Sequence, residues 1–177
     1  YSQPRDGYAL QFTSPSFISA AAQGQFSVPP WEELVPVCGL VQAEAMLFAN
    51  PSNGKFTNLQ EMVDYAKENP GKISVAIDTP NGISGAVFKT FSDALGLEFN
   101  WITSDADESI ISVIAGDIDM VVATWTDAGA YSESGDLLAV CTLTEQQSTV
   151  LPDVPSSASV GAPVGLGYYR VFTALEG

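Results

Sequence analysis

The sequence predicts an α/β protein with a largely parallel sheet. Short apolar runs, typical of buried strands, alternate along the chain with stretches in which apolar residues recur at helical spacing. Glycine, proline and polar capping residues separate most of these segments. The 177 residues are enough for one or two small domains with a sizeable core.

The N-terminal part of the sequence is expected to form strands and one short helix. Residues 8–13 are expected to form a strand that Ser14, Pro15 and Ser16 interrupt, and a short helix begins at about residue 17. Strands are expected over residues 34–40 and 45–49.

The middle of the chain carries the clearest helix signals. Thr57 with Gln60 three residues later forms a capping-box pattern, and the helix that follows ends at Asn69. A strand over 73–77 and a loop over 78–82 lead to a helix over 84–95, for which Gly96 is the natural terminator.

The remaining elements repeat this alternation. We expect one helix capped by Asp105 or Asp107 that stops at Gly116, and another capped by Thr126 or Asp127 that closes near Gly135. The expected strands are residues 99–102, 120–124, 137–143 and 168–173, with an extended connector over 151–155.

Strand–loop–helix units of this kind bind ligands at one edge of the sheet. The crevice lies beyond the carboxyl ends of the strands, where the helices begin. The loops that the pattern places there are 14–16, 78–84, 103–107 and 124–128. The topology indicates where a site would lie and leaves the ligand open.

Composition excludes several classes of function. The chain has 21 acidic and 6 basic residues, a net charge of −15, and its bases are scattered. Nucleic-acid binding needs clustered positive charge, so we exclude it, and an acidic surface repels anionic membranes. No apolar run approaches the length that crosses a bilayer, and no signal peptide is recognisable, so the sequence fits a mature or a cytosolic chain.

The absence of histidine argues against an enzyme. The chain has no histidine, so the usual general base, zinc ligand and Ser–His or Cys–His pairs are missing. We expect no catalytic residues, no metal and no cofactor. Cys38 and Cys141 are either two buried apolar residues or one disulfide outside the cytosol.

The loop from Asp78 to Ser84 is the most informative candidate. We expect Gly82 to adopt positive φ and so let a ligand approach the backbone. The helix beyond it offers unpaired N–H groups and a partial positive charge, which bind a carboxylate without arginine. The alternative is an ordinary strand-to-helix turn with Ser84 as the cap.

Two further groups leave alternatives open. Asp127 either caps a helix or contacts a ligand, and Trp125 is a candidate lid or stacking wall. The cluster of Asp105, Asp107 and Glu108 serves capping and solvation or attracts a cation; it lacks the alternating oxygen ligands of a calcium loop.

Several short motifs together resemble one family, the solute-binding receptors of tripartite tricarboxylate transporters, or Bug proteins. Asp6 to Leu10 resembles the family's DGYTL strand start. The other matching segments are Asn50 to Ser52, Glu61 to Ala66, Asn69 to Lys72, Asn81-Gly82, Ala115 to Met120 and Leu151 to Pro155. Their order and spacing agree along nearly the whole chain.

The resemblance implies a type 2 periplasmic-binding-protein-like fold of two lobes that close on a small carboxylic acid. We expect residues 1–40 and 146–177 to form part of the first lobe and residues 41–145 to form a complete second lobe. From the positions matched to the family, together with Asp78 at the start of the candidate loop, the ligand-binding residues that we expect are Ser14, Pro15, Ser16, Asp78, Thr79, Asn81, Gly82, Ile83, Ser84, Thr124, Trp125 and Asp127. The resemblance also implies a periplasmic or extracellular monomer, with or without a lipid anchor when full-length, that delivers its solute to permease subunits.

Departures from the family pattern affect the ligand. Pro80 removes one backbone donor, and Asp78 repels a second carboxylate at close range. We therefore expect an amino acid or a mono- or dicarboxylate in preference to citrate. The alternative functions are a sensing module that signals to a membrane partner and, as a distant third, an α/β enzyme.

Overall fold

The computed structural model describes residues 4–27 and 30–176, which fall into two compact units. Unit 1 comprises residues 1–43 with 167–177, and unit 2 comprises residues 44–166. These boundaries differ from the expected ones at 40/41 and 145/146. Residues 146–166 belong to unit 2 because Thr142 pairs with Ser156, whose hydroxyl donates to the Thr144 carbonyl at 2.9 Å.

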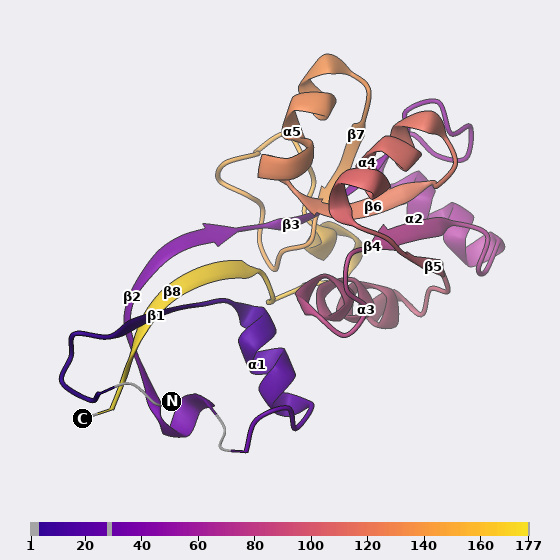
Figure 1. Ribbon diagram of the computed structural model, residues 1–177. Coiled ribbons are helices and arrows are strands. Elements are labelled where there is room, and N and C mark those ends of the chain that lie inside the picture. Colours follow the sequence, from indigo (N-terminus) through magenta and orange to yellow (C-terminus); the bar gives the residue numbers. More distant parts are fainter. Residues whose placement is uncertain (1–3, 28–29, 177) are drawn as a thin grey trace. The chain divides into compact units, whose positions relative to one another are not determined.

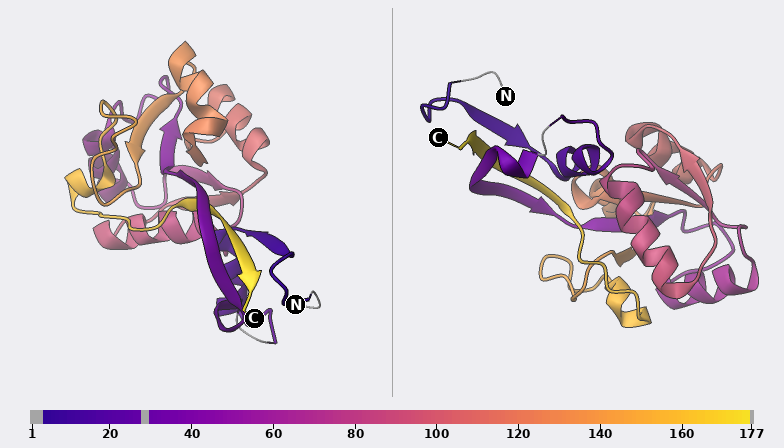
Figure 2. Two further views of the ribbon diagram at one scale, coloured as in Figure 1. Left: turned by 90° about the vertical axis from the view of Figure 1, so that its left-hand side faces the viewer. Right: turned by 90° about the horizontal axis from the view of Figure 1, so that it is seen from below.

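Unit 1 is a three-stranded antiparallel sheet with one α-helix. The strand order is β1-β8-β2, and Figure 1 and Figure 2 show the three strands side by side. Its elements are β1 (Leu10–Thr13), α1 (Pro15–Ala22), the 3₁₀ turn η1 (Pro30–Glu32), β2 (Leu34–Ala43) and β8 (Tyr168–Leu175). The three strands expected here are confirmed, with β2 and β8 longer than expected because they pair with each other along most of their length.

Unit 2 is a five-stranded mixed sheet in the order β5-β4-β6-β3-β7. Its strands are β3 (Ala45–Ala49), β4 (Ser74–Ile77), β5 (Asn100–Thr103), β6 (Met120–Thr124) and β7 (Leu138–Thr142). Its helices are α2 (Leu59–Glu68), α3 (Ile83–Leu95), α4 (Ala106–Ala115), α5 (Trp125–Ser134) and the 3₁₀ turn η2 (Ser157–Val160).

The expectation of a largely parallel sheet needs one correction. β4 pairs in parallel with both β5 and β6, but β3 is antiparallel to its two neighbours, β6 and β7. The apolar run at 45–49 identifies a buried strand but carries no information about its direction. β3 is the one strand of this sheet that enters unit 2 straight from a strand of unit 1, without a preceding helix.

The local sequence sets the ends of α3, α4 and α5 as predicted. α3, α4 and α5 end at Gly96, Gly116 and Gly135, each with positive φ, as the sequence predicts. Asp105 caps α4 by accepting from the Asp107 N–H at 3.2 Å.

The predicted caps of α2 and α5 are each displaced. Asn58, not Thr57, caps α2 by accepting from the Glu61 N–H at 3.0 Å. Glu61, not Gln60, reaches back to the Thr57 N–H and hydroxyl, and these two bonds hold the pKa of Glu61 below its ordinary value. α5 is capped by Thr124 instead of Thr126 or Asp127, because the helix begins directly at the end of β6.

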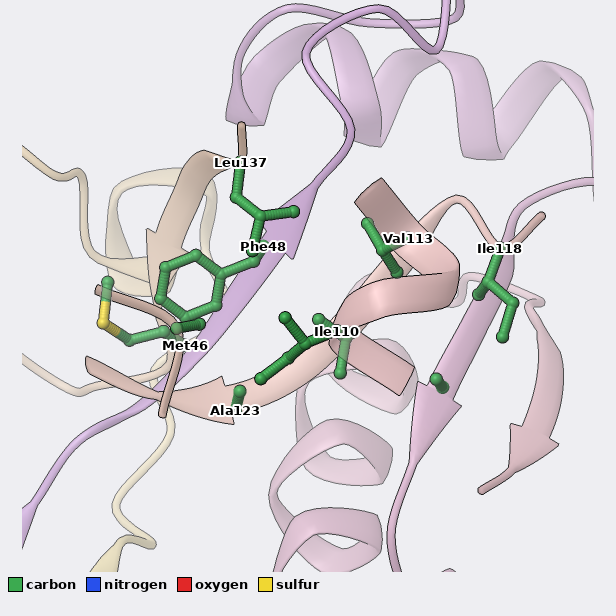
Figure 3. Packing of buried hydrophobic residues seen from close by; sticks show 10 residues of the cluster. Met46, Phe48, Ile110, Val113, Ile118, Ala123 and Leu137 are labelled. Atoms are coloured by element: carbon green, nitrogen blue, oxygen red, sulfur yellow. The ribbon is translucent and has the colours of Figure 1, made fainter. Parts of the chain in front are cut away.

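The core of unit 2 is built around β3, whose five residues are all fully buried. Met46 and Phe48 on one side of β3 pack with Ile110 and Val113 of α4 (Figure 3). Leu137 and Ala123 belong to the same cluster. α3 lies across the opposite face of the sheet from α4 and α5 (Figure 1), and Val87, Phe88 and Phe91 form its buried side.

Candidate functional site

Three loops of unit 2 leave the sheet at the same edge. β5, β4 and β6 are parallel neighbours, so their carboxyl ends at Thr103, Ile77 and Thr124 lie at one edge. The loop after β5 begins beside the end of β4, since the Ser104 N–H donates to the Ile77 carbonyl at 3.4 Å. Loops 78–84, 103–107 and 124–128 are therefore brought together as the topology predicts.

β6 extends further than β4 at this edge. Ala76 lies opposite Val121, so Thr124 lies two residues beyond the level of Ile77. At about 3.3 Å per residue, β6 extends about 7 Å further. The start of α5 therefore lies about two residues beyond the level at which the loop after β4 begins.

The loop after β4 contains a carboxylate of the chain itself, that of Asp78, close to the start of α3. Asp78 Oδ1 accepts from the Thr79 N–H at 2.7 Å and also from the Ser84 hydroxyl. Ser84 is buried and also donates to the Thr79 carbonyl at 3.3 Å. Asp78 itself is exposed. Ser84 thus ties the first turn of α3 to the loop and does not act as the N-cap.

Gly82 caps α3 without adopting positive φ, which corrects the expected conformation. Its φ is −97°, in the extended region that any residue can adopt. Glycine is needed here for space, because a Cβ atom would lie 2.9 Å from the Thr79 Cβ and 3.3 Å from its carbonyl oxygen. Valine at this position would push on the loop itself, so it would not test a ligand contact cleanly.

Gly85 is packed still more tightly. A Cβ atom built there would lie 1.9 Å from the Pro80 carbonyl oxygen, so the loop lies directly on the first turn of α3. The Gly82 N–H bonds the Thr79 carbonyl at 2.9 Å, and Gly82 offers no side-chain cap. The loop and helix start therefore form one unit, with Thr79, Pro80 and Asn81 exposed and Ile83 half-buried at its surface.

Asp127 and Trp125 both have structural partners. Asp127 Oδ2 accepts from the Thr124 hydroxyl at 2.7 Å and from the Thr124 N–H at 3.3 Å, a capping-box contact. The Trp125 ring packs near Phe48, with centroids 6.3 Å apart, and a Cβ at Gly129 would lie 2.7 Å from it. Both residues anchor α5, and a ligand role for either stays a prediction.

Ser14, Pro15 and Ser16 lie in unit 1, at the start of α1. Pro15 occupies the first turn of the helix and is buried, whereas Ser16 is exposed. Ser14 lines a cavity of about 220 Å³ between α1 and the sheet. The lining residues are Thr13, Ser14, Phe17, Ile18, Trp31, Leu34, Pro36, Tyr169, Val171 and Thr173.

One buried polar group escaped sequence analysis. Ser109, in the first turns of α4, is 1% exposed, and its hydroxyl has no hydrogen-bond partner among the described residues. Because Ser109 precedes the buried Ile110, it belongs to the inward-facing part of α4. The position of Ser109 beside the apolar residues of a predicted helix is the sequence signal that could have identified it.

The acidic side chains and the two cysteines are the remaining candidates for a metal or redox site. Among residues 4–27 and 30–176, no cluster of His, Cys, Asp or Glu could hold a metal ion. Cys38 is exposed and Cys141 is buried, and both are free, so only Cys141 matches the expected buried residue. Burial raises the pKa of the Cys141 thiol, which keeps it protonated and inert.

Two of the resemblance motifs hold the scaffold instead of a ligand. The Asn50 side chain donates to the carbonyls of Val113 and Ile114, each at 3.0 Å, and so closes the end of α4. Asp119 bonds Lys55 Nζ at 2.7 Å and the Ser74 N–H at 2.8 Å, which joins the starts of β4 and β6. Burial alone would raise the pKa of Asp119, but these bonds outweigh it and lower that pKa.

Taken together, the sheet topology and the shared loop edge define the class of α/β protein that binds ligands beyond the carboxyl ends of its parallel strands. Residues 2–173 match the family described as tripartite tricarboxylate transporter family receptor. The chain therefore belongs to this family of solute-binding receptors. Within the described residues, no helix combines the length and the apolar character that crossing a bilayer requires.

Sequence relatives agree with this family. A UPF0065 protein of Bordetella pertussis is 27% identical over 174 residues, covering 93% of this chain and 53% of its own length. Protein BugT of the same species is 25% identical over 162 residues, covering 89% of this chain and 49% of its own. The chain thus spans about half the length of the curated relatives it matches.

Solved structures show the same fold. A TctC solute-binding protein from Polaromonas matches with a TM-score of 0.84 at 18% identity, and MatC from Rhodopseudomonas palustris with bound malate matches with 0.76 at 19%. Both comparisons cover 99% of this chain and 60% of the other. The fold is therefore that of a type 2 periplasmic-binding-protein-like receptor, of which this chain forms a part.

Proposed function

We propose that this chain is part of a periplasmic or extracellular receptor that captures a small carboxylate-bearing solute. The receptor delivers that solute to the membrane permease of a tripartite tricarboxylate transporter. The family match over residues 2–173 carries the proposal. In this proposal unit 2 is the second lobe, unit 1 is part of the first lobe, and the complete receptor is a monomer with or without a lipid anchor.

The proposed contact surface on unit 2 is the loop edge after β4 and β6. No lysine or arginine occurs in residues 78–84 or 124–128, so main-chain groups would have to bind the acid. α3 is 13 residues long, its first turn contains no acidic residue, and Gly82 gives it no side-chain cap. Its start therefore offers peptide N–H groups and the positive end of a helix dipole.

Ser14 supports a contribution from unit 1. It lies at the start of α1 and lines the cavity in that unit. In the proposed mechanism the solute contacts both lobes only in the closed form, so binding shifts the population toward closure.

The preferred solute is an amino acid or a mono- or dicarboxylate, and citrate is disfavoured. Asp78 Oδ1 is occupied by the Thr79 N–H and the Ser84 hydroxyl, which keeps a negative charge beside the start of α3. A trianion would be repelled by that charge, whereas the ammonium group of a zwitterion would be attracted. MatC shares this fold, and its structure contains a bound dicarboxylate, malate.

Thermal-shift and calorimetric titrations test this proposal directly. Amino acids, malate and adipate should raise the Tm of the receptor, because a ligand that binds only the folded form stabilises it. Citrate should raise it less at equal concentration, and the neutral amide of each acid should have no effect. Tight binding of citrate without any binding of amino acids or dicarboxylates would contradict the proposed ligand class.

The alternative function is a sensing module that signals occupancy to a membrane partner. Its binding site would have the same chemistry, so solute titrations do not separate the two functions. Co-purification from detergent-solubilised membranes does: the transport function requires capture of permease subunits and solute uptake that depends on the receptor. Capture of a signalling protein without uptake would favour the alternative.

A further inference from the structure

A cavity in unit 1 combines apolar walls with a lack of charge. It has a volume of about 220 Å³ and lies between α1, η1 and the sheet, and every residue that lines it belongs to unit 1. No acidic or basic side chain occurs among the described residues of its lining. The walls are mainly the side chains of Phe17, Ile18, Trp31, Leu34, Tyr169 and Val171.

The threonines of the lining add little polar character to the cavity. The Thr13 hydroxyl donates to the Val171 carbonyl at 3.1 Å, and the Thr173 hydroxyl donates to the Gln11 carbonyl at 3.3 Å. Both hydroxyl hydrogens are therefore used within the sheet. Ser14, at the start of α1, makes no capping hydrogen bond with its side chain. The cavity thus suits a group that is apolar over most of its surface.

The cavity is formed before any ligand binds and is only partly covered. The Phe17 ring is held by an edge contact with the Phe26 ring, with centroids 4.8 Å apart. Trp31 is 59% exposed and Ile18 is 49% exposed, so both present apolar surface that a ligand can cover. Burial of that surface favours binding, and a wall fixed in advance lowers the entropic cost of binding.

We propose that this cavity holds an apolar ring carried by the carboxylate solute, an inference that rests on the proposed function. Apolar cavities of about 150 Å³ bind benzene, so a cavity of about 220 Å³ has room for a six-membered ring. Phe17, Trp31 and Tyr169 line it with aromatic rings, and ring-to-ring contacts stabilise an aromatic guest beyond its burial.

The lining narrows the class of solute. A second carboxylate in the cavity would lose its hydration, and no cation in the described lining would offset that loss. We therefore expect arylalkanoates and aromatic amino acids to bind more tightly than malate or other small dicarboxylates.

Titration calorimetry with three matched pairs of acids measures the contribution of the ring. The pairs are phenylacetate with acetate, 3-phenylpropionate with propionate and 4-phenylbutyrate with butyrate, which differ in the linker between acid and ring. In at least one pair the ring should raise affinity about 10–100-fold, the effect of burying an apolar group of this size.

The same titrations distinguish the inference from the function on which it rests. Ratios near one in all three pairs, with measurable binding of propionate or malate, would overturn the inference and leave the proposed function standing. Absence of binding by every acid tested, with malate and the amino acids included, would overturn both.

Two variants and one matched control test whether the ring lies in the cavity. Val171→Phe fills the cavity, so the affinity ratio of the best pair should fall to near one. Ile18→Ala removes part of the wall but keeps a good helix former, and it should lower the ratio about fivefold. Val41→Phe adds the same ring opposite Arg170, which points to the other side of the sheet from Val171, and should leave the ratio unchanged. Equal ratios in the two phenylalanine variants and an unchanged ratio in Ile18→Ala would overturn the inference.

A brominated probe locates the ring directly. In crystals with the para-bromo form of the best-binding arylalkanoate, anomalous scattering should place the bromine beside Trp31 and Val171. Bromine found only outside the cavity would overturn the inference. If Ile18→Ala changes the mass of the protein in solution and leaves the affinity ratios alone, the cavity is a contact between copies of the chain, which would also overturn it.

Discussion

Asp78 is the residue on which the proposed ligand preference depends. Its carboxylate accepts from the Thr79 N–H and the Ser84 hydroxyl at the beginning of α3. A bound acid group that approached the same helix start would meet this charge. We therefore propose that Asp78 selects solutes by their charge, in a loop that lacks any cationic side chain.

Replacing Asp78 with asparagine should shift the ligand preference from zwitterionic amino acids toward acids with more negative charge. Asp78→Asn keeps an acceptor for both bonds but removes the negative charge, so affinity for malate should rise about tenfold, or about 1.4 kcal/mol. Affinity for a zwitterionic amino acid should fall at the same time. Calorimetry with both solutes measures the change, and Asp153→Asn removes the same charge from an exposed connector as a control. An equal change for both solutes would mean that Asp78 acts on stability and not on charge selection.

At the scale of elements, the loop after β4 and the start of α3 form one packed piece. Gly85 has no room for a side chain beneath the Pro80 carbonyl. Ser84 adds hydrogen bonds to Asp78 and Thr79 across the same contact. The position of the loop is therefore set by packing on α3 and not by glycine torsion freedom at Gly82.

Gly85→Ala should force this loop away from the helix. The new methyl group would overlap backbone atoms, so we expect a loss of about 1–3 kcal/mol or more in unfolding free energy. Solute affinity should fall with it, because residues 78–82 move. Thermal melts and titrations measure both effects, and Gly39→Ala, where the added Cβ meets nothing within 4 Å, is the matched control. Unchanged stability in Gly85→Ala would contradict the close loop contact.

The link between the starts of β4 and β6 predicts a pH dependence. The pKa of Asp119 is lowered in the folded protein by Lys55 and Ser74, so the folded state binds this proton less readily than the unfolded chain. The stabilisation is complete above the ordinary aspartate pKa of about 4 and is lost as pH falls through the lower folded value. Asp119→Asn should cost about 1–3 kcal/mol at neutral pH and flatten the acid limb of the Tm–pH curve. A variant that keeps the wild-type acid limb would exclude Asp119 as its cause.

Across the whole molecule, charge and burial are divided between the units. Unit 1 has exposed apolar side chains on its sheet, and its formal charge is −2, from Asp6, Glu32, Glu33 and Glu176 against Arg5 and Arg170. Unit 2 combines a fully buried central strand with the other −13 of the total −15. Self-repulsion in unit 2 destabilises its compact state. Screening by salt should weaken that repulsion.

Raising NaCl from about 0.02 M to about 0.5 M should therefore raise the Tm, since the screening length falls well below the size of the unit. A variant with Asp117, Glu133 and Asp153 changed to their amides should show a higher Tm at low salt and a smaller rise with salt. These three side chains are exposed, so their replacement does not disturb the core. An identical salt response in the two proteins would show that charge repulsion is not the cause.

The sequence alone determined the order of strands and helices and most helix ends. Apolar spacing marked α2 and α3, and glycine marked the ends of α3, α4 and α5, because these signals act within a few residues. The same locality explains the errors at the caps: Thr57 and Asn58 are both good caps, and only the position of Glu61 distinguishes them. The loop edge after β4, β5 and β6 was also predictable, because parallel strands must end on one side.

The tertiary structure decided what depends on partners distant in sequence. The antiparallel direction of β3 follows from its pairing with β6 and β7, which an apolar run cannot specify. Folding also creates the hydrogen bonds by which Asn50 and Asp119 join distant segments. The same holds for the close contacts at Gly82 and Gly85. The exposure of Leu10, Phe12 and Val41 in unit 1 is of the same kind, because the exposure of a side chain depends on what packs on its strand and not on the residue alone.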